Sequence, residues 1–150
     1  MAPQPQAPDL GAIKERQQKA WSSADYGKVG VALVIMAERF CEAADLRSGG
    51  QVLDVASGNG NAALAAARRV CDVIGIDYVP MLLEEGRERS GAEGLRVDFR
   101  EGDAENLSFT DASFDVVLST LGVMFAPNQE KVASELPRVC RPGGRICLTN

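Results

Sequence analysis

Residues 51–63 have the sequence Gln-Val-Leu-Asp-Val-Ala-Ser-Gly-Asn-Gly-Asn-Ala-Ala, and this stretch decides the fold. The segment 52–56 is apolar except for Asp54, as expected for a short strand covered on both faces. Gly58 and Gly60 follow, and an Ala-rich segment after them favours a helix. Strand, glycine-rich turn and helix are typical of a nucleotide-binding loop, because glycines let a ligand approach backbone N–H groups closely.

Four more predicted strands follow, and helices alternate with them. The strands are expected at residues 71–77, 95–100, 114–120 and 145–149, and the helices at residues 62–69, 81–90 and 127–140. Pro137 is expected to kink or shorten the last helix. Alternating strands and helices form right-handed βαβ units, so we predict an α/β fold with a parallel sheet.

The residues before the first strand have a different character. Residues 1–9 are rich in Pro and Gln, so we expect them to be disordered. A polar helix is predicted at residues 10–24 and an amphipathic helix at residues 28–46. Trp21 and Tyr26 have two interpretations: they pin this arm to the domain, or one of them closes over a ligand.

The composition limits the function classes. A chain of 150 residues suits one domain, and 45% hydrophobic with 25% charged residues is typical of a soluble globular protein. The net charge of −5 argues against a nucleic-acid partner. No apolar run is long enough to span a bilayer, and we see no signal peptide. We therefore expect a cytoplasmic location and no membrane partner.

The chain has four cysteines and no histidine. The missing histidine excludes Ser-His-Asp and Cys-His catalysis and most zinc sites, so we expect no metal. The cysteines show no C-x-x-C pairing, and we interpret them as small buried hydrophobic residues in a reducing compartment.

Polar residues stand at the ends of four predicted strands. They are the loop from Asp54 to Gly60, then Asp77, Asp103, Ser119 and Thr120. In parallel sheets, ligands bind beyond the carboxyl ends of the strands, so we expect these residues to form one site.

The kind of nucleotide has two interpretations. Gly58-x-Gly60-x-x-Ala63 fits the dinucleotide fingerprint, and Asp77 stands where a ribose-binding acid belongs, which favours a nicotinamide-dependent oxidoreductase. Against this, Asp54 lies within the strand, where dinucleotide folds usually carry an apolar residue, and the loop has no basic residue for a pyrophosphate. An acidic series suits a cationic ligand that carries an amino group, a ribose diol and an adenine.

Four motifs in order resemble those of class I S-adenosylmethionine-dependent methyltransferases. Residues 52–60 look like motif I, residues 75–78 (Gly-Ile-Asp-Tyr) like the acidic second motif, residues 102–109 with 113–117 like the third, and residues 136–146 like the turn before the fifth strand. The likeness covers about residues 20–150 and is closest in style to the ubiquinone/menaquinone-type branch, which methylates small molecules.

The resemblance implies a role for each matching position. The turn of Ala56, Ser57, Gly58, Asn59 and Gly60 would cradle the methionine end of S-adenosylmethionine, and Asp54 would help to hold its ammonium group. Asp77, followed by Tyr78, would accept the ribose hydroxyls; Asp103 and the Ala104 N–H would bind the adenine; Ser119 and Thr120 would lie near the sulfonium; and Tyr26 would close over the site. No catalytic residue is assigned. Ala56 replaces the first Gly of the commonest motif, which is tolerable if its φ stays negative.

The resemblance also implies an architecture. We expect a Rossmann-like three-layer sandwich with strand order 3-2-1-4-5, lacking the usual last two strands, so that the fifth strand is an exposed edge able to pair with a second copy. We divide the chain into a disordered N-terminus (1–9), helices that cap the site (10–50) and a cofactor-binding domain that looks truncated at its C-terminus (51–150). The implied function is methyl transfer to a small-molecule acceptor, or the cofactor-binding portion of such an enzyme. A catalytically silent S-adenosylmethionine-binding module and the oxidoreductase remain as alternatives.

Overall fold

The computed structural model describes residues 8–23 and 26–150, and of Tyr26 and Gly27 only the backbone. Disorder is predicted for residues 1–9, and residues 1–7 of this segment lie outside the described range. The helices are α1 (Leu10–Ser23), α2 (Tyr26–Ala32), α3 (Val34–Ala43), α4 (Asn61–Arg68), α5 (Pro80–Ala92), the short 3₁₀ helix η1 (Val123–Phe125) and α6 (Gln129–Val139). The strands are β1 (Gln51–Val55), β2 (Asp72–Asp77), β3 (Val97–Glu101), β4 (Phe114–Thr120) and β5 (Cys140–Thr149).

The five strands form one parallel sheet in the order β3-β2-β1-β4-β5. This confirms the predicted strand order. Because every strand runs in the same direction, the carboxyl ends of all five strands lie at the same end of the sheet. The strand that carries Asp54, β1, is at the centre of the sheet.

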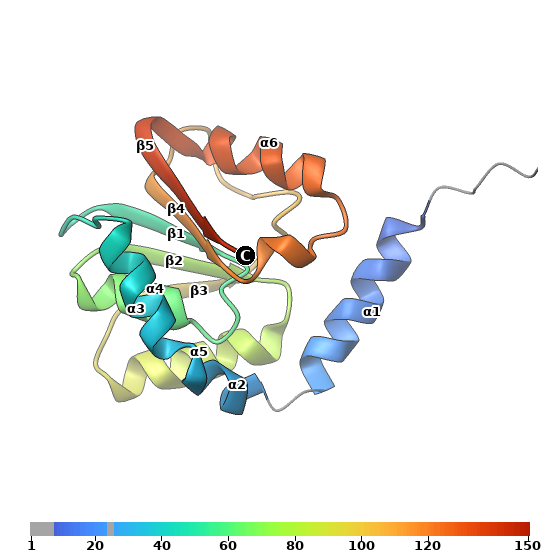
Figure 1. Cartoon of the computed structure of the whole chain (residues 1–150), viewed down its shortest axis with the longest axis horizontal. Helices are drawn as coiled ribbons and strands as arrows, with labels where there is room; N and C mark the ends of the chain where they lie inside the picture. Colours follow the sequence, from blue (N-terminus) through green and yellow to red (C-terminus); the bar gives the residue numbers. More distant parts are fainter. Residues whose placement is uncertain (1–7, 24–25) are drawn as a thin grey trace, which may run out of the picture.

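Helices cover both faces of the sheet, as predicted for a three-layer sandwich (Figure 1). Helices α3, α4 and α5 lie on one face and α6 lies on the other. Neighbouring residues of β1 face opposite layers: Val52 belongs to the core cluster with Ala37 of α3, and Leu53 to the cluster with Leu136 of α6. Each face therefore buries its own apolar core.

The predicted helix at residues 28–46 is interrupted at Leu33. The Gly30 carbonyl accepts hydrogen bonds from the Leu33 N–H (3.1 Å) and from Asn61 Nδ2 (2.8 Å). In a continuous helix the Gly30 carbonyl would accept the Val34 N–H, but here it accepts the side-chain N–H of Asn61. This contact ends α2 and attaches it to the start of α4.

The last strand also differs from its prediction, because β5 begins at Cys140 rather than at residue 145. Its ladder pairs Phe114 with Cys140 and then Val116 with Arg145. Residues 141–144, which lie in the stretch that resembles the turn before the fifth strand, therefore bulge out within the strand. Helix α6 continues through Pro137 for two residues, which places the proline in its last turn.

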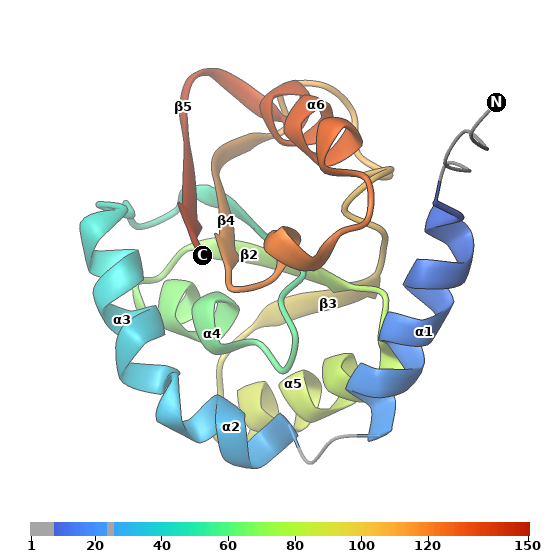
Figure 2. The same cartoon turned by 45° about the vertical axis from the view of Figure 1, so that its right-hand side comes forward.

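Helix α1 lies apart from both helical layers, on the side of the molecule where the strands end (Figures 1 and 2). It begins after Asp9, whose Oδ1 accepts the Ala12 N–H at 3.1 Å and so caps the helix. None of its residues is buried. In the part of the chain that the structure describes, no helix is long and apolar enough to cross a membrane.

Candidate functional site

The loop after β1 bends back over the end of β2. The Ser57 N–H donates to the Ile76 carbonyl (2.8 Å), and the Gly60 N–H donates to the Ser57 carbonyl (2.9 Å). To make this bend, Ala56 adopts a φ of 56°, so the condition of a negative φ, under which alanine is tolerable at this position, is not met. The left-handed conformation costs a non-glycine residue about 1–2 kcal/mol, so packing of the loop outweighs local strain at this position.

Gly60 serves packing rather than the cavity. A Cβ atom at Gly60 would lie 2.6 Å from Cζ of Phe99, and its φ is 85°. The same ring also fills the space beside Gly75 of β2, where a Cβ atom would lie 3.0 Å away, and beside Gly86 of α5, at 2.8 Å. One aromatic ring of β3 therefore fits against three glycines and holds the loop, β2 and α5 together.

Asp54 is buried, with 1% of its surface exposed. Its Oδ2 accepts the Ala63 N–H in the first turn of α4 at 2.9 Å, while its Oδ1 has no hydrogen-bond partner. Burial raises the pKa of this carboxyl group to about 7, and the nearby Asp77 adds to the effect. A buried acceptor without a partner, in the lining of a cavity, is typical of a ligand-binding atom.

Asp77 is oriented by the backbone on both sides. Its Oδ2 accepts the Gly58 N–H (2.8 Å) and its Oδ1 accepts the Val79 N–H (2.9 Å). Burial raises the pKa of the Asp77 carboxyl group, and the backbone hydrogen bonds oppose this rise. Each carboxylate oxygen can accept a second hydrogen bond, so Asp77 retains the capacity to bind a diol.

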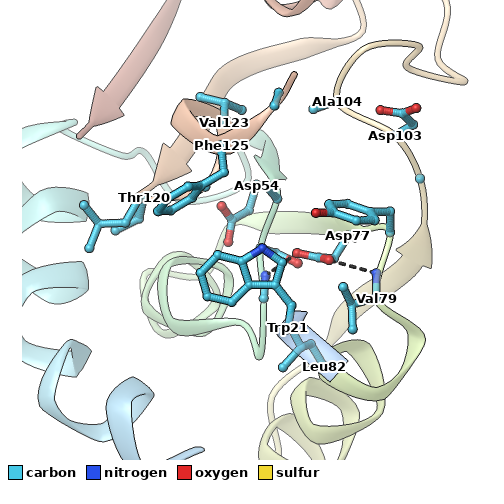
Figure 3. Close-up of a pocket in the computed structure, with 18 of the residues that line it drawn as sticks. Trp21, Asp54, Asp77, Val79, Leu82, Asp103, Ala104, Thr120, Val123 and Phe125 are labelled. Carbon is cyan, nitrogen blue, oxygen red and sulfur yellow. Dashed lines mark hydrogen bonds between the residues drawn. The ribbon is translucent and has the colours of Figure 1, made fainter. Parts of the chain in front are cut away.

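One cavity lies at the carboxyl ends of the strands, and Figure 3 shows its lining. It is lined by each predicted site residue whose side chain is described, except Gly60 and Ser119. The residues that it brings together are Asp54, the turn from Ala56 to Asn59, Asp77, Tyr78, Asp103, Ala104 and Thr120. The predicted contact of Tyr26 falls on a side chain outside those that the structure describes.

Two predicted site residues use their side chains elsewhere. Ser119 is fully buried; its Oγ donates to the Val55 carbonyl (2.7 Å) and accepts the Val123 N–H (3.2 Å). Asn59 reaches the cavity, but its Oδ1 accepts a hydrogen bond from Arg89 of α5 at 3.0 Å. The geometry thus gives Ser119 and the Asn59 amide group structural roles.

Further residues of the cavity were not predicted. Asn61, the first residue of α4, lines it with an Oδ1 that is buried and has no hydrogen-bond partner. Its position directly after the glycine-rich loop was a usable signal. Lys14 of α1 forms ion pairs with Asp103 (2.6 Å) and Glu105 (2.8 Å), and all three line the cavity. No sequence motif indicates a contact between residues so far apart in the chain.

The residues present fit S-adenosylmethionine. Four polar side-chain atoms in the lining are buried and have no partner: Asp54 Oδ1, Ser57 Oγ, Asn61 Oδ1 and Thr120 Oγ1. Acidic groups at the ends of β1, β2 and β3 suit an ammonium group, a ribose diol and an adenine amino group.

A family model described as a methyltransferase domain matches residues 53–148, which include this entire strand-end series. The chain belongs to the methyltransferase domain family. Members of this family depend on S-adenosylmethionine. The cofactor predicted from the motifs is therefore that of the family.

Three similar proteins illustrate the relationship. An uncharacterised protein of Mycobacterium tuberculosis is 41% identical over 134 residues, which are 89% of this chain and 49% of that protein. A demethylmenaquinone methyltransferase of Deinococcus radiodurans is 39% identical over 100 residues, 65% of this chain and 42% of that enzyme. The solved structure of a putative methyltransferase from Bacillus halodurans is 33% identical, with a TM-score of 0.71, over 75% of this chain and 49% of that one.

The chain spans about half the length of the curated relatives that it matches. These matches support the methyltransferase interpretation and give no support to the oxidoreductase or to the silent binding module.

Proposed function

We propose that this chain is the S-adenosylmethionine-binding portion of an enzyme that methylates a small molecule. The observation that carries the proposal is the convergence of unpartnered, buried polar atoms in one acidic cavity, at Asp54, Ser57, Asn61 and Thr120. Buried polar atoms without partners are rare in folded proteins, and a ligand with amino and hydroxyl groups satisfies them.

The chain's residues have distinct tasks in this proposal. The Asp77 carboxylate holds the ribose, Asp103 and Ala104 hold the adenine, and the loop after β1 holds the methionine end. When bound, S-adenosylmethionine supplies a methyl group on a positively charged sulfur, which is a leaving group that needs no protonation. The protein therefore contributes alignment and exclusion of water, and chemistry of this kind is compatible with a chain that has no histidine.

Demethylmenaquinone is the first acceptor to test, because it is named in a relative that is 39% identical over 100 residues. The assay measures transfer of a labelled methyl group from S-adenosylmethionine to this quinone in its reduced form. Cofactor binding without transfer to any of a panel of small-molecule acceptors would favour the silent binding module.

Calorimetric titration with S-adenosylhomocysteine tests the cofactor site directly. We expect the wild-type chain to bind it, Asp77→Ala to abolish binding, and Asp72→Ala, at the opposite end of the same strand, to leave binding unchanged. NADH serves as the competing ligand. A folded wild-type chain that binds NADH and not S-adenosylhomocysteine would overturn the proposal.

A further inference from the structure

Helix α1 presents one face to the cavity. Lys14, Gln17, Gln18 and Trp21 are spaced by three or four residues, so they lie on one side of the helix. Gln17 Nε2 donates to the Phe125 carbonyl (2.9 Å) and Gln18 Nε2 donates to the Tyr78 carbonyl (2.5 Å). Lys14 and Trp21 line the cavity. These contacts fix the helix between the loop after β2 and the residues that follow β4.

Trp21 meets a second aromatic ring at this position. Its ring centroid lies 5.2 Å from that of Phe125, and the two planes make an angle of 63°. Both side chains line the cavity, and Figure 3 shows them with the Asp54 carboxylate behind them. In an edge-to-face pair, the two rings direct their faces to different sides, so an aromatic pair can offer an electron-rich face to a bound ligand.

The charges around these rings favour a cation. The acidic and basic side chains among the described lining residues are Asp54, Asp77, Asp103, Glu105 and Lys14, and the one base among them is paired with two of the acids. Aromatic faces attract positive charge, and the attraction is larger in a site shielded from water. The acidic groups and the aromatic rings thus both favour binding of a positively charged group.

We infer that Trp21 and Phe125 form an aromatic wall that binds the positively charged methylsulfonium group of the cofactor and distinguishes it from the neutral thioether of the demethylated product. This inference rests on the proposed function. The wall contributes to binding before transfer and loses its attraction once the sulfur becomes neutral. The chain then releases the product more readily than it releases the cofactor.

Comparison of two ligands that differ in this charge tests the inference. Calorimetry gives the dissociation constants of S-adenosylmethionine and S-adenosylhomocysteine for the wild type, Trp21→Leu and Trp21→Phe. Removal of the aromatic face should weaken binding of the sulfonium ligand roughly 2- to 30-fold more than binding of the thioether. Trp21→Phe should retain part of the difference. The ratio of the two constants is independent of any fraction of misfolded protein.

The control is Gln18→Ala, which removes a contact of α1 with Tyr78 and keeps the ring. We expect this variant to weaken both ligands by the same factor. The chain has a single tryptophan, so its fluorescence gives a second measurement: in the wild type, S-adenosylmethionine should change the emission more than S-adenosylhomocysteine does.

Each outcome is decisive. If Trp21→Leu weakens both ligands equally, the ring contacts a part that they share, which overturns the aromatic wall and leaves the proposed function in place. If the folded wild type binds neither ligand, the proposed function fails and the inference fails with it.

Discussion

The Gly58 N–H donates to Asp77 Oδ2 at 2.8 Å, so one carboxylate joins the glycine-rich loop to the end of β2. The Val79 N–H occupies the other oxygen at 2.9 Å. The residue that is predicted to bind the ribose therefore also fixes the shape of the loop that is predicted to bind the methionine end. Stability and cofactor affinity are coupled through this side chain.

Asp77→Asn should reduce both the stability of the fold and the affinity for the cofactor. The amide presents an N–H₂ group to one of the two backbone donors, and an unpaired buried donor costs about 1–3 kcal/mol. We expect the free energy of unfolding in urea to fall by that amount and the affinity for S-adenosylhomocysteine to fall with it. Asp72→Asn, which has an exposed side chain on the same strand, is the matched control. A variant as stable as the wild type would contradict the bridging role.

Ala56→Gly should stabilise the protein. Glycine adopts the observed φ of 56° without strain, and relief of about 1 kcal/mol exceeds the added entropy of the unfolded chain. Urea unfolding measures the change. Ala133→Gly, at an exposed position of α6, should have the opposite effect and lower the free energy of unfolding by about 1 kcal/mol. A loss of stability at residue 56 would show that the Ala56 methyl group contributes packing that outweighs the strain.

Cofactor affinity should increase with pH up to about 7. The pKa of Asp54 is raised to about 7, and a cationic ligand prefers the ionised carboxylate. Below that pH, the dissociation constant of S-adenosylmethionine should rise up to roughly tenfold for each pH unit. For the unliganded chain, the raised pKa gives a stability contribution that is present at low pH and is lost as the pH rises towards 7. Asp54→Asn, which can still accept the Ala63 N–H, should remove the pH dependence of cofactor affinity and that of stability. If either pH dependence remained in this variant, another group would be responsible for it.

Substitutions around Phe99 should depend on one another. Gly86→Ala places a Cβ atom 2.8 Å from the ring and should destabilise the protein by about 1–3 kcal/mol. Phe99→Leu in the same chain should recover part of this loss, which a double-mutant cycle in urea measures. Gly91→Ala, in the same helix with nothing within 4 Å, should instead stabilise the protein by up to about 1 kcal/mol. Independent effects at residues 86 and 99 would contradict the shared packing.

The β5 edge of the sheet is expected to pair with a second copy of the chain. Among the described residues, β5 pairs with β4 alone, and Ile146 and Leu148 are 39% and 44% exposed. Light scattering after size-exclusion chromatography should show dimers at high concentration. Leu148→Lys should reduce dimer formation, whereas Ile35→Lys on α3, which is 69% exposed, should not. Equal effects of the two variants would indicate general hydrophobic association.

Local patterns in the sequence predicted the strands, apart from the start of β5, and most of the polar residues that line the strand-end cavity. Buried strands are apolar runs, and polar residues interrupt these runs where a ligand approaches, as at Asp54, Asp77 and Asp103. The order of the strands came from the family resemblance rather than from any local pattern.

The remaining differences between the predicted and the observed structure arise from contacts between segments that are distant in the sequence. The break at Leu33 depends on Asn61, which takes the Gly30 carbonyl across 31 positions of the chain. The positive φ of Ala56 depends on the packing of the loop against β2, and Ser119 is bound to the Val55 carbonyl rather than exposed to the cavity. None of these contacts has a periodic signature that a sequence could reveal.

Helix α1 closes one side of the cavity without burying any residue of its own. Among the described residues, the contacts that attach it include the ion pairs of Lys14, the hydrogen bonds of the Gln17 and Gln18 amides and the contact of Trp21 with Phe125. Detachment of such a helix exposes little apolar surface and breaks contacts that salt weakens. The residence time of the cofactor should therefore shorten as ionic strength rises, while the folded core that binds it stays intact.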